Sequence, residues 1–156
     1  MSYDSVNSLA LLTARLTLGS VFFAHGAQKV LGWFGGFGIN GTMGYFQNTL
    51  GVPAALAFFG VIAELAASIL LIFGASTGLA AIIVILQMAA AIYLSHANDG
   101  FFMNYFGRLP AGREGYEYNL VLIGIALVLF IAGPGRYSLD SVWSLDFVRK
   151  AVGLAH

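Results

Sequence analysis

The sequence predicts an all-α protein, an integral membrane four-helix bundle that forms a single membrane domain over residues 1–156. Two observations lead to this fold class. Hydrophobic residues make up 59% of the chain and charged residues only 9%, with a mean hydropathy of +0.84, whereas a soluble domain averages about 25% charged residues. The apolar residues also form four long spans without the polar stripes that a soluble bundle would need.

The spans are expected at about residues 9–31, 53–73, 77–95 and 115–132. At about 1.5 Å per residue, the first is long enough to cross the roughly 30 Å hydrocarbon core of a bilayer. No positively charged region precedes it, so we expect a retained anchor and not a cleaved signal. The short link between spans two and three predicts antiparallel neighbours. Gly133-Pro134-Gly135 ends span four.

The connection from Gly32 to Gly51 is rich in glycine and aromatic residues and has no charge. This composition predicts a short interfacial helix, around Thr42–Leu50, or a re-entrant loop. The connection could be a lid over the bundle or a flexible gate for a lipid-soluble molecule, with Trp33 and Phe37 as binding residues. Residues 136–156 are expected to form an interfacial tail.

Charge and cysteine content exclude several classes of function. The net charge of zero gives no electrostatic reason for a nucleic-acid partner. The absence of cysteine excludes disulfides, thiol redox chemistry and cysteine-ligated metals or clusters. Four spans place both termini on one side, where Arg136, Arg149 and Lys150 favour a cytoplasmic location in a prokaryotic plasma membrane.

One predicted polar layer lies near the middle of the membrane. Counting residues from the ends of the spans puts Arg15 and Glu64 at similar heights, with Gln87 close by. We therefore expect an Arg15–Glu64 contact, with Gln87 as a candidate third member. Such a pair could hold the helices together or serve a function, since intramembrane charges do both.

A second predicted layer lies near one interface and contains His25, Lys29, His96 and Glu117. Its groups could bind a divalent metal, relay protons or hydrogen-bond a quinone head group. One conflict is visible: Gln87 and His96 are nine residues apart and point in opposite directions on a regular helix. Either the helix ends before His96 or one of the two faces away from the bundle.

Three residues of the tail are predicted to form a turn and a helix cap. Gly135, Ser138 and Asp140 are residue types that favour turns and helix N-terminal caps.

Taken in order, these features make the chain resemble the DoxX family of small membrane proteins. The likeness covers nearly the whole chain, and its separate pieces become specific only as an ordered set. They are Arg15, Ala24-His25-Gly26-Ala27-Gln28-Lys29, Glu64, His96, Gly100-Phe101-Phe102, Glu117-Tyr118 and Gly133-Pro134-Gly135-Arg136-Tyr137-Ser138-Leu139-Asp140.

The resemblance implies a four-helix integral membrane protein. Some relatives are named as subunits of a thiosulfate:quinone oxidoreductase or of a terminal quinol oxidase, and others are linked to membrane oxidoreductase assemblies in redox stress. The leading hypothesis is therefore a membrane subunit of a quinone-linked oxidoreductase system with a protein partner, in which a partner or a substrate supplies the electrons. His25 and Lys29 would bind the quinone, Glu117 or His96 would exchange protons with it, and the glycine-aromatic connection would admit its isoprenoid tail.

Two rival hypotheses come from other classes. The chain could be a non-catalytic scaffold or assembly protein for a redox complex, or a small transporter that uses Glu64 as its proton site. Whether the chain is itself an enzyme, and whether it forms a homo-oligomer, stay open at this point.

Overall fold

The computed structural model describes residues 3–143, and all of the regular structure in that range is helical. The predicted membrane helical bundle is confirmed. Three helical stretches are long and apolar enough to cross a membrane, Asp4–Leu31, Ala54–Phe73 and Thr77–Asp99, and Glu117–Ala132 is a shorter apolar helix. The part of the predicted tail beyond residue 143, with Arg149 and Lys150, lies outside the described residues.

Helix α1, Tyr3–Leu31, begins earlier than predicted and carries Asp4 in its first turn, where a negative charge favours the helix dipole. It ends before Gly32, whose positive φ of 73° suits glycine. Helix α3, Ala54–Phe73, begins directly after Pro53 and ends at Gly74, where φ is 65°. These ends follow from the preference of proline for helix starts and of glycine for helix ends.

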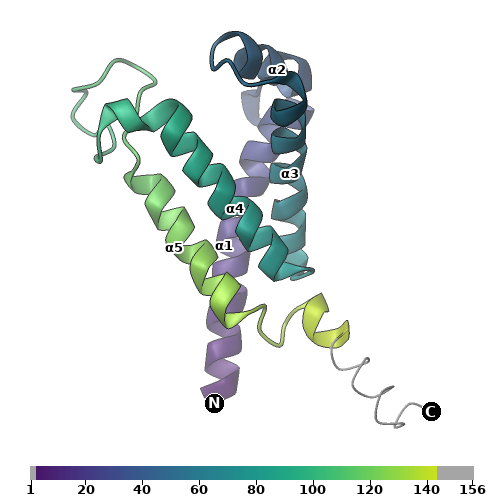
Figure 1. Ribbon diagram of the computed structural model, residues 1–156. Helices are drawn as coiled ribbons and strands as arrows, with labels where there is room; N and C mark the ends of the chain where they lie inside the picture. The colour runs from purple at the N-terminus through teal and green to yellow at the C-terminus, as the bar shows by residue number, and fades with distance from the viewer. Residues whose placement is uncertain (1–2, 144–156) are drawn as a thin grey trace.

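The predicted short helix between the first two spans is present. A 3₁₀ turn, Trp33–Gly35, leads into helix α2, Gly38–Asn48, which lies across the end of α1 and α3 (Figure 1). The Thr42 hydroxyl is buried and donates to the Lys29 carbonyl at 3.0 Å. This bond ties α2 to the last turn of α1.

Helix α4, Thr77–Ala91, continues as a π-helical turn, Ile92–His96, and a 3₁₀ turn, Ala97–Asp99. A long loop then leads to helix α5, Glu117–Ala132, which ends at Gly133. Residues 133–143, which we call the clasp, then pass beside the first half of α1 and the turn between α3 and α4, and become helical again at 139–143.

The helices pack as two pairs. Helix α1 lies against α3, and α4 lies against α5, with α3 also packed on α4. Within residues 3–143, the two helix pairs approach each other near the clasp and diverge toward α2 and the long loop (Figure 1). The buried apolar core joins both pairs through Leu18, Phe22, Ala67, Leu71, Ala80, Ala81, Val84, Leu122, Ala126 and Leu129.

Close contact between α1 and α3 depends on two glycines of α1. A methyl group on Gly19 would lie 2.8 Å from Ile72 Cγ1, and one on Gly26 would lie 2.9 Å from Leu65 Cα. These two contacts fix the antiparallel register, because seven residues along α1 match seven residues back along α3. The same register determines which polar side chains can meet.

Candidate functional site

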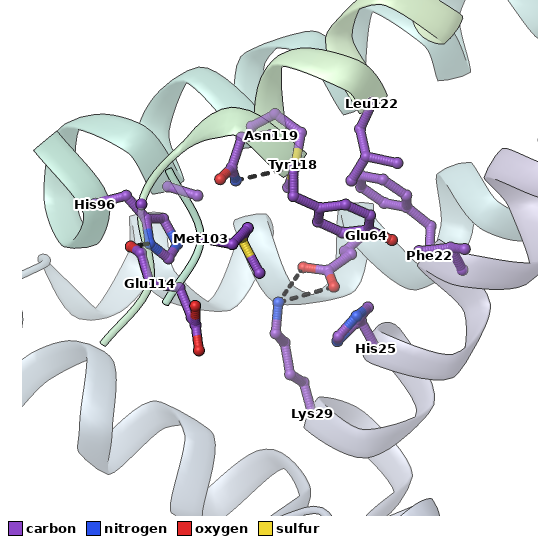
Figure 2. Close-up of a pocket in the computed structure, with 14 residues that line it drawn as sticks. Phe22, His25, Lys29, Glu64, His96, Met103, Glu114, Tyr118, Asn119 and Leu122 are labelled. Atoms are coloured by element: carbon purple, nitrogen blue, oxygen red, sulfur yellow. Dashed lines mark hydrogen bonds and ion pairs between the residues drawn. The ribbon is translucent and has the colours of Figure 1, made fainter. Parts of the chain in front are cut away.

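A cavity of about 260 Å³ lies where the two helix pairs diverge. Figure 2 shows polar side chains entering it from both pairs, among apolar ones. Its lining comprises Val21, Phe22, His25 and Lys29 of α1; Glu64 of α3; Met88, Ala91 and His96 of the α4 region; Met103, Glu114 and Gly115 of the long loop; and Tyr118, Asn119 and Leu122 of α5.

Lys29 and Glu64 form an ion pair in this cavity. The Lys29 ammonium donates to both carboxylate oxygens, at 2.8 Å to Oε1 and 2.6 Å to Oε2 (Figure 2). The Glu64 side chain is 8% exposed and that of Lys29 is 32% exposed. A carboxylate that is removed from water needs such a partner, because an uncompensated buried charge is strongly destabilising.

The pair follows from the register of α1 and α3. Gly26 packs directly against Leu65, so Lys29, about one turn further along α1, is close enough for its long side chain to reach Glu64. His25 is one turn before Lys29 on the same face of α1 and also lines the cavity. It is exposed, which places it at the mouth and not at the bottom of the cavity.

The π-helical turn brings His96 to the cavity. An additional residue in one turn rotates the direction of later side chains by about 100°. Gln87, before the turn, donates to the Gly60 carbonyl of α3 at 3.0 Å, whereas His96, in the turn, lines the cavity. The conflict between these two residues in a regular helix is thereby resolved.

His96 is held in a defined tautomer by the long loop. Its Nδ1 lies 2.7 Å from the backbone carbonyl oxygen of Glu114. Because a carbonyl only accepts, Nδ1 must carry the hydrogen, and a neutral His96 then has Nε2 as an acceptor.

Other polar contacts shape this loop around the cavity. The Glu114 Oε2 accepts from the Asn104 backbone N–H at 2.6 Å, and the Asn104 side chain exchanges two hydrogen bonds with Leu109, each of 2.9 Å. Asp99 forms an ion pair with Arg113. These contacts fold the loop back so that Met103 and Glu114 reach the cavity.

The prediction that Glu117 belongs to this layer is wrong. Asn119 and Leu122 line the cavity, and two residues of an α-helix turn the side chain by about 200°, so Glu117 points away from it. Glu117 instead lines a second depression of about 530 Å³, with Phe101, Tyr105, Tyr118, Leu120 and Val121. There it hydrogen-bonds the Tyr105 hydroxyl, which raises the pKa of Tyr105 above its usual value.

The predicted Arg15–Glu64 contact is also wrong. The Arg15 guanidinium is fully buried and donates to two backbone carbonyls, at 3.2 Å to Leu71 and also to Tyr137 of the clasp. The prediction places Arg15 and Glu64 at similar heights because it counts residues from the apparent ends of the spans. In the structure Gly19 lies against Ile72, and this register places Arg15 beside the end of α3. The expected three-residue layer therefore does not form, because Arg15, Glu64 and Gln87 each have other partners.

Gly135, Ser138 and Asp140 form a turn and a helix cap in the clasp. The Ser138 hydroxyl donates to the Gly135 carbonyl at 2.6 Å. The Asp140 carboxylate accepts from the Ser76 and Thr77 backbone N–H groups, at 2.6 and 2.8 Å, at the start of α4. The cap thus stabilises the N-terminus of a helix that lies far away in the sequence.

The structure does not bring the aromatic residues of the first connection into the cavity. Trp33 and Phe37 are 52% and 86% exposed and are not part of the lining. Trp33 packs edge-on against Phe23 of α1. Within residues 3–143, no group of three or more histidine and carboxylate side chains is arranged to hold a metal ion.

The sequence profile of the DoxX family matches residues 10–97, more than half of the chain. The chain belongs to the DoxX family. The matched region of this DoxX protein includes five charged or histidine residues, namely Arg15, His25, Lys29, Glu64 and His96.

Three bacterial proteins are similar to this DoxX chain over most of their length. The membrane protein Rv3486 of Mycobacterium tuberculosis, described as uncharacterised, is 29% identical over 84% of the chain and 79% of its own. "Putative oxidoreductase CatD" of Bacillus subtilis is 26% identical over 78% of both chains. The inner membrane protein YphA of Escherichia coli is 26% identical over 88% of the chain and 93% of its own. No solved structure matches the chain.

Sequence reasoning missed several cavity residues of this DoxX protein. It assigned Glu64 to the wrong layer and did not single out Glu114, Tyr118 or Asn119 as site residues. A signal for Asn119 exists in the spacing of Asn119, Leu122, Ala126 and Leu129, which are all buried. This stripe identifies the inward face of α5 and places Glu117 outside it.

Proposed function

We propose that this DoxX protein is the membrane subunit of a quinone-linked oxidoreductase system and binds the head group of a quinone or quinol in the cavity. The observation that carries the proposal is the convergence of His25, Lys29, Glu64 and His96 in one largely apolar cavity. Binding sites for small lipid-soluble molecules are mostly apolar, with a few polar groups that fix orientation.

The donors and acceptors of the lining match both redox forms of such a head group. Lys29 donates only, and His25 can donate one hydrogen bond, which suits the carbonyl oxygens of a quinone. Glu64 and the His96 Nε2 can accept from the hydroxyls of a quinol. When bound, a quinone would supply the two-electron chemistry that no side chain of this cysteine-free chain supplies.

In this proposal the ion pair holds the proton-exchanging group in place. The Lys29 ammonium orients the Glu64 carboxylate through both oxygens, so one oxygen can accept a hydrogen bond from a bound quinol while the other stays bound to Lys29. The Glu114 carbonyl keeps the His96 ring in the tautomer that accepts at Nε2. The Bacillus subtilis relative is named "Putative oxidoreductase CatD", and this name supports the same reaction class.

The test is calorimetric binding of a short-chain quinone to the purified protein in lipid nanodiscs. His25→Ala and Lys29→Met should each weaken binding about 2- to 12-fold, the equivalent of a lost hydrogen bond of about 0.5–1.5 kcal/mol. Gln47→Ala, an exposed change in α2, is the control and should leave the affinity unchanged. Absence of binding to the folded wild type, or an unchanged affinity in both cavity variants, would contradict the proposal.

A further inference from the structure

The two depressions described above share one side chain. Tyr118 lines the cavity between the helix pairs, and it also lines the outer depression beside Glu117. Its ring extends from α5 into the cavity (Figure 2). Tyr118 therefore lies between the cavity and the outer depression.

The outer depression has the chemistry of a surface for an apolar chain. Five of its six lining residues are large exposed hydrophobic or aromatic side chains: Phe101 at 43%, Tyr105 at 73%, Tyr118 at 42%, Leu120 at 43% and Val121 at 58%. Glu117 and Tyr105 supply its polar atoms, and they are hydrogen-bonded to each other. Because these two polar groups already bind each other and the rest of the lining is apolar, the depression favours a hydrocarbon chain over a second polar head group.

The depression also lies on the route to the lipid. Leu120 and Val121 are on an apolar helix and are exposed on the outside of the bundle, whereas Leu122 of the next position faces the cavity. By contrast, no residue of the glycine-aromatic connection, 32–51, lines either depression. The hypothesis that this connection admits an isoprenoid tail has no support in the described contacts.

We infer that the outer depression, from Phe101 to Val121, is the binding groove for the isoprenoid tail of the molecule whose head group occupies the cavity. This inference rests on the proposed function and adds the position of the tail and the residue that divides it from the head group. The tail would lie on Leu120 and Val121, and the Tyr118 ring would separate it from the Lys29–Glu64 pair.

The experiment compares two probes that have the same benzoquinone head group, one with a decyl tail and one with a methyl group. Val121→Trp fills the groove from an exposed position that takes no part in the cavity. It should weaken binding of the tailed probe about tenfold and leave binding of the tail-less probe unchanged. Binding is measured in nanodiscs of one lipid composition, and the melting temperature confirms folding of each variant.

Val128→Trp is the matched control. Val128 is on the same face of α5, seven residues further along, and is 52% exposed, but it lies outside both depressions. It should leave the affinity for both probes unchanged. An equal loss in both tryptophan variants would show that the tail has no defined groove, and would overturn the inference.

The outcomes separate this inference from the proposed function. If the tail-less probe binds wild type and Val121→Trp has no effect on the tailed probe, the groove is refuted and the head-group site stands. If only the tailed probe binds, and Val121→Trp weakens it, the head-group site is refuted, and the groove binds an apolar chain without it. If neither probe binds, both are refuted.

Discussion

At the scale of single residues, two buried charged groups, Glu64 and Arg15, have different kinds of partner. Glu64 is neutralised by a side chain, the ammonium of Lys29, whereas the two terminal nitrogens of the Arg15 guanidinium donate to backbone carbonyls. The Lys29–Glu64 pair lines the cavity, whereas Arg15 ties α1 to the end of α3 and to the clasp and has a structural role.

A double-mutant cycle tests this division. Lys29→Met and Glu64→Gln should each lower the unfolding free energy in detergent by about 1.5–3 kcal/mol, because each leaves a charged partner unmatched. The double variant should lose less than the sum of the two single losses. The reference cycle joins Arg15→Met with Glu64→Gln and should be additive within about 0.5 kcal/mol, since their partners differ. Coupling of Arg15 to Glu64 would show that the register of α1 and α3 is incorrect.

The contact between Tyr105 and Glu117 can be tested by titration. The carboxylate favours the neutral phenol, so Tyr105 should keep its proton at pH values where an ordinary tyrosine, with a pKa of about 10, ionises. The difference in ultraviolet absorbance between wild type and Tyr105→Phe isolates this residue from the other tyrosines. Glu117→Gln should lower the pKa of Tyr105 toward its usual value. An unchanged midpoint would mean that Glu117 does not lie beside Tyr105.

At the scale of helices, the sequence predicts the bounds of each helix better than the relative heights at which two helices pack. Pro53, Gly74 and Gly133 mark helix ends by backbone chemistry that is local, so the spans could be placed. The relative height of two helices is not local. It is determined by Gly19 and Gly26 against α3, a contact that no span boundary indicates.

The candidate site was predictable to a similar degree. His25 and Lys29 share a face by simple helical spacing, and both line the cavity. The position of His96 depends on a π-helical turn, and that of Glu114 on a loop held by Asn104, neither of which has a periodic signal. Such contacts arise from tertiary structure.

The junction of α3, α4 and the clasp gives a prediction at this scale. Gly74 has φ of 65°, and a methyl group on it would collide with the Arg15 guanidinium and with Ser138. Gly74→Ala should therefore destabilise the protein by at least about 1–2 kcal/mol, the cost of the left-handed conformation alone. Gly124→Ala in α5, with open space around it and ordinary helical geometry, should be neutral or slightly stabilising in the same denaturation assay. Equal stability of the two variants would contradict the packing at this junction.

At the scale of the whole molecule, His25 and Lys29 of the cavity lie toward the end of α1, whereas the clasp contacts Ser8 and Arg15 in its first half. The proposed head-group site is therefore near one membrane face, and the Arg15 junction is near the other. The protein is an integral membrane protein, like the relatives described as membrane proteins. Which end faces the cytoplasm decides from which side the site would exchange protons.

Single cysteines can establish this orientation, because the chain has none of its own. Arg108→Cys, in the long loop, and Arg136→Cys, in the clasp, are both exposed positions. Membrane-impermeant thiol reagents should label them from opposite sides, with Arg136→Cys on the cytoplasmic side. Labelling of both from one side would contradict a bundle in which α5 crosses the membrane.

The clasp also has a consequence for the order in which the protein assembles during synthesis. Arg15 belongs to α1, which is synthesised before the other described helices, but one of its two carbonyl acceptors, at Tyr137, is synthesised after α5. The Ser76 and Thr77 backbone N–H groups at the start of α4 likewise have their carboxylate acceptor only after Asp140 has been synthesised. Chains that stop before residue 137 would carry a buried guanidinium with an acceptor missing, which is costly in a membrane. The contacts that join α1, α3 and α4 at this junction can therefore form only after the clasp has been synthesised.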